Sequence, residues 1–349
     1  MKNRLFFLCP DNDVPSGGVK QIYRQVDLLN ENGFNAYVIH NRKNYRASWF
    51  KNETKILRNR FLFKTIKYIR KQNQSHFRKQ YNSYILKYLK EISFELNDSD
   101  YVIFPEIYAH FISEINIVCK KVIFNQNCYY TFLNKNDNYP FENNYSSKSV
   151  EAVIVVSRNS EEYLNLAFQN IRIYRTRLGI DSDIFNFSNN KKRQIAYMPR
   201  KLKDDVDQVI NIINLRGKLS DWSFVEIDGK SEEAVAKILK ESALFLSFNH
   251  KEGFGLPPAE AMACGCVVIG YRGEGGKEYF NENFCFPIKD GDIIEFIKKI
   301  EFVTSNHSFQ NLLEIGQKAS DFILSNYNSD IEKNDVISIW QKIILNTND

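Results

Sequence analysis

The feature that most constrains the fold is the segment 243–265, where an apolar run, a glycine-bearing loop and a new helix follow one another. Residues 243–248 are almost entirely apolar and predict a buried strand. Pro257 and Pro258 stand where the first turn of a helix tolerates a missing N–H. Because unpaired N–H groups point outward from a helix start, this order of elements predicts an anion site.

Two carboxylates, Glu252 and Glu260, flank the predicted anion site. They would repel a bare phosphate, but a carboxylate can accept hydrogen bonds from two vicinal hydroxyls. The pattern therefore favours a ligand that carries hydroxyls beside its phosphates, which describes a nucleotide sugar. The alternative is an ordinary helix N-terminus that is stabilised by acidic residues in its first turn.

The segment resembles the Glu-x7-Glu signature of the retaining glycosyltransferases of the GT-B fold, in particular family 4 (group 1). Residues 253–257, 260–263 and 265–270 also resemble that family. The resemblance implies that Glu252 faces the hydroxyls of the donor sugar and that Glu260 holds the ribose diol. It also implies that backbone amides lie against the sugar and diphosphate, namely those of Phe254, Gly255 and Leu256.

The resemblance and the order of elements predict an α/β protein of GT-B type, with two Rossmann-like doubly wound domains facing a central cleft. We expect an acceptor-side domain at 1–178 and a nucleotide-sugar-binding domain at 179–330. Residues 331–349 are expected to form a terminal helix that packs back on the first domain. The strands expected from apolar runs are 5–9, 36–40, 101–104, 121–124, 152–156, 195–198, 222–227, 243–248 and 266–269, and the other helices are 19–32, 205–215 and 231–241.

A glycine pair, Gly17 and Gly18, precedes the first predicted helix. It does not fit the dinucleotide fingerprint G-x-G-x-x-G, which argues against a dehydrogenase. By resemblance, such a pair lets the backbone approach the donor phosphate or the acceptor. The alternative is a plain tight turn.

Polar residues follow the predicted strands of the first half, and ligands of open α/β sheets gather at the carboxyl ends of strands. His110, Gln126 and Asn127 are therefore expected on the acceptor side, although a histidine often stands in the family where Gln126 or Asn127 stands here. Glu106 is a catalytic candidate that would orient or deprotonate an acceptor hydroxyl. Alternatively, Glu106 caps the helix that follows it.

Basic residues follow the first strand of the second domain and resemble those that neutralise the donor diphosphate in the family. Arg200 is the best match, and Lys201 and Lys203 compete for the second role. Departure of a nucleoside diphosphate requires positive charge where negative charge develops. The alternative is an exposed basic loop.

No metal and no cofactor is expected, because the resemblance implies a metal-independent reaction in which the nucleotide sugar is a substrate. The nearest paired acids, Asp11 and Asp13, stand in a loop that turn chemistry explains. The six cysteines lack zinc spacing and are expected to be reduced. With no apolar run long enough to span a bilayer and no signal peptide, we expect a cytoplasmic protein.

The net charge of +5 hides a basic stretch, because residues 42–90 contain fifteen Lys or Arg and a single acid, Glu53. Within residues 55–90, basic and apolar groups alternate at roughly helical spacing, which suits contact with an anionic membrane surface. An alternative of equal weight is a solvated basic face whose apolar side packs on the domain. Nucleic acid attracts the same residues but is not the expected partner.

The sequence thus predicts a glycosyltransferase that moves a hexosyl or deoxyhexosyl group from a nucleotide sugar to a saccharide or lipid-linked saccharide, with retention. Its setting would be bacterial surface-glycan assembly, such as lipopolysaccharide or capsule, on the inner face of the membrane. Two rivals keep the same fold: an epimerase acting on a nucleotide sugar, and a binding protein without catalysis.

Overall fold

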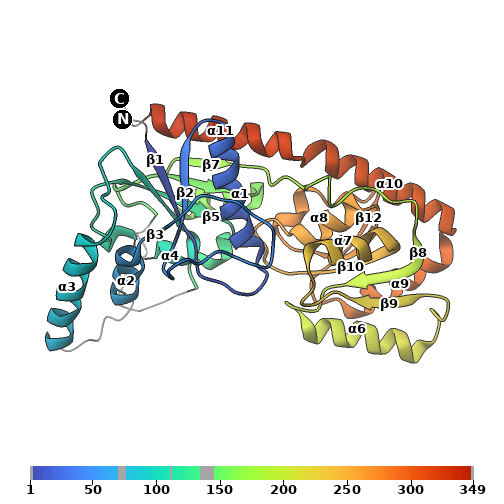
Figure 1. Ribbon diagram of the computed structural model, residues 1–349. Helices are drawn as coiled ribbons and strands as arrows, with labels where there is room; N and C mark the ends of the chain where they lie inside the picture. Colours follow the sequence, from blue (N-terminus) through green and yellow to red (C-terminus); the bar gives the residue numbers. More distant parts are fainter. Residues whose placement is uncertain (1–2, 70–75, 111, 134–144, 347–349) are drawn as a thin grey trace. The chain divides into compact units, whose positions relative to one another are not determined.

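The computed structural model describes residues 3–69, 76–110, 112–133 and 145–346, and the chain forms two compact units (Figure 1). Apart from the short segment Ser157–Asn159, the first division falls after Thr176, close to the expected boundary after residue 178. The second falls inside the last helix, at Asp335, four positions after the expected start of that segment. Unit 1 comprises Met1–Val156, Ser160–Thr176 and Asp335–Asp349, and unit 2 comprises Ser157–Asn159 and Arg177–Asn334.

Unit 1 is built on a seven-stranded parallel sheet with the order β3-β2-β1-β4-β5-β6-β7. Its central strands contain runs of buried apolar residues, at 5–8, 101–104 and 122–124, as expected of a parallel sheet covered on both faces. The strands are β1 (Arg4–Leu8), β2 (Asn35–His40), β3 (Ile56–Arg58), β4 (Tyr101–Pro105), β5 (Lys120–Asn125), β6 (Val150–Val155) and β7 (Ile173–Arg175).

Helices and short helical turns connect these strands. The stretch 55–69 does not form one continuous helix, because β3 pairs with β2 at the sheet edge before α2 begins. The helical elements are α1 (Gly17–Glu31), α2 (Arg60–Ile69), α3 (His76–Glu91), α4 (Glu106–Ala109) and α5 (Arg158–Ala167), with the 3₁₀ turns η1 (Ile112–Glu114) and η2 (Cys128–Tyr130).

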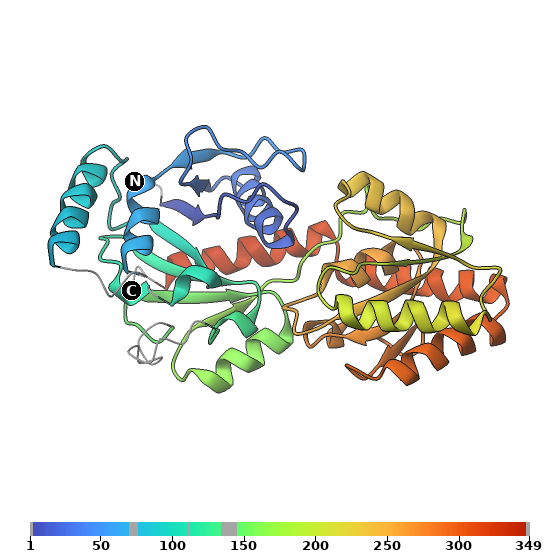
Figure 2. The ribbon, with the colours of Figure 1, turned by 90° about the horizontal axis from the view of Figure 1, so that it is seen from below.

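Unit 2 is built on a five-stranded parallel sheet with the order β12-β11-β10-β8-β9. One face packs on α6 and α9 through Leu244, Leu246 and Phe248 of β10, and α7, α8 and α10 pack together elsewhere in the unit (Figures 1 and 2). The elements are β8 (Lys192–Tyr197), α6 (Lys203–Arg216), β9 (Ser223–Glu226), α7 (Glu232–Glu241), β10 (Ser242–Asn249), α8 (Leu256–Ala263), β11 (Val267–Arg272), the 3₁₀ turn η4 (Gly275–Glu278), β12 (Cys285–Ile288), α9 (Ile293–Asn306) and α10 (Phe309–Asn326).

The last helix, α11 (Ser329–Leu345), is divided between the units. Its indole Trp340 is fully buried in unit 1, where the ring lies 5.9 Å from that of Phe7 and 5.8 Å from that of Tyr101. Glu332, one of its residues in unit 2, accepts a hydrogen bond from the Gly179 N–H. The same helix therefore contributes to both cores.

Candidate functional site

The order in which strands are added to the sheet of unit 2 reverses between β8 and β10. The chain passes from β8 to β9 on one side and then returns to place β10 on the other side of β8. Loops that leave two such strands diverge and leave a crevice at the carboxyl ends, the usual ligand position in doubly wound sheets. The loop after β8 holds Arg200 and Lys201, and the loop after β10 holds Glu252.

The structure brings two of these candidates into direct contact. The Lys201 ammonium forms an ion pair with the Glu252 carboxylate, and both side chains retain partial exposure to solvent. Arg200 and Lys203 are exposed, and Lys203 is the first residue of α6. Of the two lysines that compete for the second basic position, Lys201 is therefore the one that lies against the predicted sugar-positioning carboxylate.

The loop between β10 and α8 depends on Gly255. This residue has φ +88°, and a Cβ there would lie 2.1 Å from Asn249 Nδ2. Both the left-handed backbone and the close side chain exclude other residues. Gly255 is the N-cap of α8 and Leu256 is its first residue. The backbone amide groups of the first helical turn therefore lie next to the loop.

The two glutamates lie on different elements. Glu252 precedes α8, whereas the half-buried Glu260 lies inside it, past the first turn. The first turn of α8 contains no acidic residue, so the alternative of acidic residues stabilising that turn is wrong. The spacing instead places one carboxylate before the helix and the other one turn into it.

A second glycine-rich turn, η4, lies directly against the loop between β10 and α8, because β10 and β11 are parallel neighbours in the sheet. The Gly275 N–H donates to the Glu252 carbonyl oxygen over 3.1 Å. A Cβ on Gly275 would lie 2.1 Å from the Gly253 carbonyl oxygen, so only glycine allows this approach. The backbone that carries Glu252 is thus held by a second loop.

Tyr279, just after η4, is a residue that the sequence analysis missed. Its buried hydroxyl contacts the carbonyl oxygens of Phe254, at 3.2 Å, and of Gly255. Its ring lies 5.0 Å from the Phe254 ring, which also contacts Tyr327. The Phe254 side chain is therefore part of a core, and only its backbone can face a ligand. The sequence signal that could have identified Tyr279 is its position as an aromatic residue directly after a glycine-rich loop.

In the sheet of unit 1 the strand order also reverses, between β1 and β4. Gly18, Glu106 and Gln126 follow β1, β4 and β5, and the structure brings them together. Gln126 Nε2 donates to the Gly18 carbonyl over 3.1 Å, and the Gln126 N–H donates to Glu106 Oε2 over 3.1 Å. Gly18 of the glycine pair and two residues proposed from strand ends, Glu106 and Gln126, therefore form one cluster.

The two glycines of this cluster are helical. Gly17 and Gly18 open α1 after Ser16, and neither has a positive φ, so the tight-turn interpretation is wrong. The interpretation of Glu106 as the cap of α4 is also wrong, since the N-cap is Pro105 and Glu106 is the first residue of the helix. Burial raises the pKa of Glu106 to about 7, against the smaller opposite effect of its hydrogen bond from Gln126.

The remaining acceptor-side candidates, Asn127 and His110, are buried like Glu106. Asn127 is buried, and its side-chain oxygen accepts from the Tyr129 N–H over 3.0 Å, which caps η2. His110 is buried at the end of α4. Neither side chain is exposed, and that of Asn127 is engaged in capping η2.

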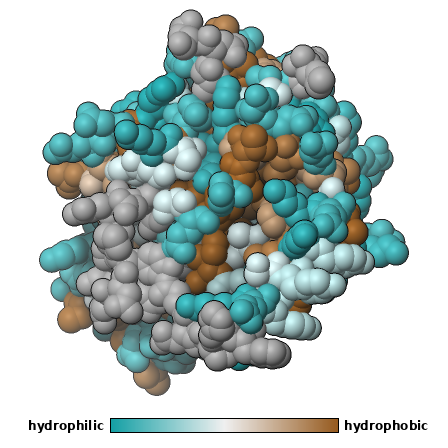
Figure 3. Space-filling model, turned by 90° about the vertical axis from the view of Figure 1, so that its left-hand side faces the viewer, coloured by the Kyte–Doolittle hydropathy of each residue, from teal (hydrophilic) through white to brown (hydrophobic). Residues whose placement is uncertain are grey.

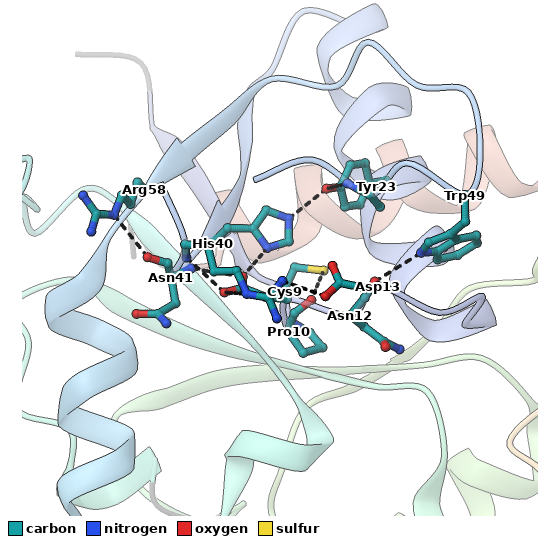
Figure 4. A network of polar contacts seen from close by, with 12 residues as sticks. Cys9, Pro10, Asn12, Asp13, Tyr23, His40, Asn41, Trp49 and Arg58 are labelled. Carbon is teal, nitrogen blue, oxygen red and sulfur yellow. Dashed lines mark hydrogen bonds and ion pairs between the residues drawn. The ribbon is translucent and has the colours of Figure 1, made fainter. Parts of the chain in front are cut away.

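A buried polar network fastens the loop that leads from β1 to α1 (Figure 4). The Tyr23 hydroxyl lies 2.8 Å from His40 Nε2, and His40 Nδ1 lies 2.9 Å from Asp11 Oδ1. Asp11 also accepts from the N–H groups of Asn41 and Arg42. Its oxygens are thus occupied by protein donors, in agreement with a structural role for this acidic loop.

Among the residues that the structure describes, no group of three or more His, Cys, Asp or Glu side chains is arranged to hold a metal ion. Across the same described residues, no helix combines the length and apolar character needed to cross a membrane. The six cysteines are buried and form no disulfide.

Part of the chain is similar to a known protein family. Residues 206–320, which lie within unit 2, match the family described as glycosyl transferases group 1. Over 223 residues the chain is 28% identical to an alpha-1,6-glucosyltransferase of Actinobacillus pleuropneumoniae serotype 7. The match covers 59% of this chain and spans 64% of the length of that relative.

Solved structures resemble the whole chain. Sucrose-phosphate synthase from Thermosynechococcus elongatus has a TM-score of 0.68 at 12% identity, covering 99% of this chain and 100% of its own. Anabaena HepE, solved in complex with UDP-glucose, has a TM-score of 0.65 at 12% identity, with 97% and 99% covered. The predicted fold class, GT-B with two Rossmann-like domains, is confirmed.

Proposed function

We propose that the protein is a glycosyltransferase that moves a sugar from a nucleotide-sugar donor to a hydroxyl of a saccharide or lipid-linked saccharide. The observation that carries this proposal is the contact of Lys201 with Glu252 at the change of strand order in unit 2. A cation beside a carboxylate suits a ligand with both phosphates and hydroxyls. The match to group 1 glycosyltransferases begins at residue 206, within α6 and five positions after Lys201, and includes both glutamates.

Each residue has a proposed role in the donor site. Lys201 and the exposed Arg200 neutralise the diphosphate as it leaves, which lowers the barrier because negative charge develops there. Glu252 accepts hydrogen bonds from the donor sugar, and Glu260 accepts them from the ribose diol. The amides that surround Gly255 and open α8 face the sugar and phosphates.

The acceptor is assigned to unit 1. Gln126 and the backbone at Gly17 and Gly18 would position the acceptor or the donor phosphate, with Asn127 and His110 supporting them. Glu106 is proposed to receive or orient the proton of the attacking hydroxyl. A carboxyl whose pKa is raised to about 7 is suited to accept a proton near neutral pH.

The proposed reaction retains the anomeric configuration, transfers a hexosyl or deoxyhexosyl group and needs no metal or cofactor. The relative named alpha-1,6-glucosyltransferase supports a hexosyl donor. We place the reaction in bacterial surface-glycan assembly, such as lipopolysaccharide or capsule, in the cytoplasm, where buried free thiols stay reduced.

A thermal-shift screen against a panel of nucleotide sugars tests the donor site, because a ligand of the folded state raises the melting temperature. Release of nucleoside diphosphate from the selected donor is then measured with and without glycan acceptors, and the anomer formed is read by NMR. Release that depends on an acceptor supports transfer. Conversion of the donor without any acceptor would indicate an epimerase, and binding without turnover a non-catalytic protein.

A further inference from the structure

Asn249, the last residue of β10, carries a buried side-chain amide without a protein partner. The residue is only 7% exposed, and its Nδ2 donates a hydrogen bond to no other residue that the structure describes. Nearly all buried polar groups in folded proteins are hydrogen-bonded, because a donor that is removed from water without an acceptor is unfavourable. The Asn249 amide therefore requires an acceptor that the described chain does not supply.

The amide of Asn249 lies against the N-terminus of α8. Its Nδ2 is 2.1 Å from the position that a Cβ of Gly255 would take, and Gly255 is the N-cap of that helix. It is 3.6 Å from the corresponding position at Gly273. Because neither glycine has a side chain, the amide lies next to backbone and close to the unpaired N–H groups of the first helical turn. All of these groups are hydrogen-bond donors, and the acceptor that suits them together is an anion.

Arg272, the last residue of β11, adds a positive charge beside Asn249. The two residues are register partners in the parallel pair of β10 and β11, so their side chains leave the same face of the sheet. Phe248 and Tyr271, one position earlier in each strand, point to the opposite face and pack in the core with residues of α6 and α9. The Arg272 guanidinium is half-buried, and it forms no hydrogen bond or ion pair within the described part of the chain.

The exposed cations of unit 1 differ from Arg272 in this respect. Those of α3 are exposed, and hydrophilic residues surround hydrophobic ones on the side of the molecule where α3 lies (Figure 3). Water solvates such charges, so they need no further partner. A half-buried guanidinium has lost part of its hydration, and pairing with an anion compensates for that loss.

We propose that Asn249 and Arg272 are further donor-binding residues, which contact phosphate oxygens of the nucleotide sugar at the N-terminus of α8. This inference rests on the proposed function, because the diphosphate of the donor is the anion that the proposed reaction brings to this site. The amide donates one hydrogen bond, and a guanidinium can donate two in parallel to one phosphate. Arg200 and Lys201 follow β8, on the other side of β10, so the diphosphate is contacted from the ends of three adjacent strands.

Calorimetry with nucleoside monophosphates and diphosphates tests these contacts, because the two ligands differ by one phosphate. The probes are UMP and UDP, GMP and GDP, and AMP and ADP. The wild type should bind one diphosphate more tightly than its monophosphate. Asn249→Leu and Arg272→Gln should each weaken binding of that diphosphate by roughly 10- to 100-fold, as expected for a lost hydrogen bond to a charged group.

The stability of Asn249→Leu separates ligand binding from a structural role. Leucine has a shape similar to that of asparagine and removes an unpaired donor, so the melting temperature should stay constant or rise. The matched control is Gln194→Met in β8, which removes a buried amide that donates to Ser242 Oγ over 2.7 Å. Its melting temperature should fall, while its nucleotide affinity stays that of the wild type.

Arg193→Gln is the control for net charge, since Arg193 lies near the amino end of β8, away from the carboxyl ends of the strands. It should leave nucleotide affinity unchanged, and a loss equal to that of Arg272→Gln would overturn the assignment of Arg272. A lower melting temperature of Asn249→Leu with full affinity would show that this amide serves the fold alone.

The same measurements distinguish failure of this inference from failure of the proposed function. A wild-type protein that binds no nucleotide of the panel and no nucleotide sugar overturns both. Diphosphate binding that Asn249→Leu and Arg272→Gln leave unchanged overturns this inference alone. A loss confined to the intact nucleotide sugar would move the contact to the sugar and would also overturn it.

Discussion

Lys201 and Glu252 meet although about fifty residues separate them in the chain, because β8 and β10 are neighbours in the sheet of unit 2. The pair joins a group suited to phosphate with a group suited to hydroxyls. It also distinguishes Lys201 from Lys203, which the sequence left as equal candidates. The donor site proposed for this protein depends on that distinction.

Replacing Lys201 by Met should lower kcat/KM for the selected donor by about 10²–10³, because charge on the departing diphosphate loses its partner. The matched control is Lys203→Met, which removes the same charge two positions away and should change kcat/KM only slightly. Steady-state kinetics of nucleoside diphosphate release measures both. Equal losses in the two variants would contradict the assignment.

Replacing Gly255 by Ala should destabilise unit 2 and impair donor binding. The new Cβ would meet Asn249 Nδ2 at 2.1 Å in a left-handed backbone. Overpacking and the unfavourable φ together should cost roughly 3 kcal/mol. Gly217→Ala is the control, since Gly217 has φ +61° with nothing within 4 Å, and should cost only about 1 kcal/mol. Urea unfolding of both variants compares these costs, and similar values would refute the steric account.

Replacing Tyr279 by Phe removes a hydroxyl that holds the carbonyls of Phe254 and Gly255. We expect a loss of about 1 kcal/mol in unfolding free energy. We also expect a weaker donor affinity in calorimetry, because the loop amides lose their orientation. Tyr84→Phe removes a hydroxyl in solvent and should change neither quantity. Unaltered donor affinity in Tyr279→Phe would show that the hydroxyl stabilises the fold alone.

Replacing Gly18 by Ala separates folding from ligand approach. The position is helical, and the added Cβ would lie 3.4 Å from Gln126 Oε1, which the flexible amide can accommodate. The melting temperature should therefore stay constant or rise slightly, since Ala favours a helix over Gly by roughly 1 kcal/mol. If a ligand approaches this backbone, KM rises while stability does not fall. A drop in melting temperature would contradict the expected accommodation.

Glu106 should make the stability of unit 1 depend on pH. Its pKa rises from 4.5 in the unfolded chain to about 7 in the folded protein. Between these values the folded state binds more protons, so the free energy of unfolding falls as pH rises, by about 3 kcal/mol in total. Glu106→Gln should lack this component. Urea unfolding at intervals from pH 4.5 to 7.5 compares the two proteins, and parallel curves would disprove the assignment.

The fold was largely predictable where apolar runs are long. The expected strands at 101–104 and 243–248 match β4 and β10 within two residues at each end. The short strands β3, β7 and β12 carry no distinct pattern of their own. They form because a neighbouring strand offers backbone partners, as β2 does for β3, and such pairing depends on contacts distant in sequence.

The candidate site was predictable in its parts but not in its connections. Glycine and proline positions determined the loop before α8, since backbone freedom is a local property of residue type. Tyr279 was not predicted, because the sequence does not distinguish it from an ordinary core tyrosine. Its hydroxyl reaches the Gly255 carbonyl oxygen only when β10 and β11 pair. The alternative in which Glu106 caps the following helix was wrong by one residue, because Pro105 is the N-cap of α4.

The sequence by itself determined which chemical groups are available and the local geometry that presents them: a strand, a glycine loop and a helix bearing Glu252 and Glu260. Only the tertiary structure decided which groups meet. Lys201 faces Glu252, and Gln126 joins Gly18 to Glu106, because parallel pairing aligns the carboxyl ends of strands that are distant in the chain. Local preference is encoded residue by residue, whereas these contacts require the sheets to be assembled.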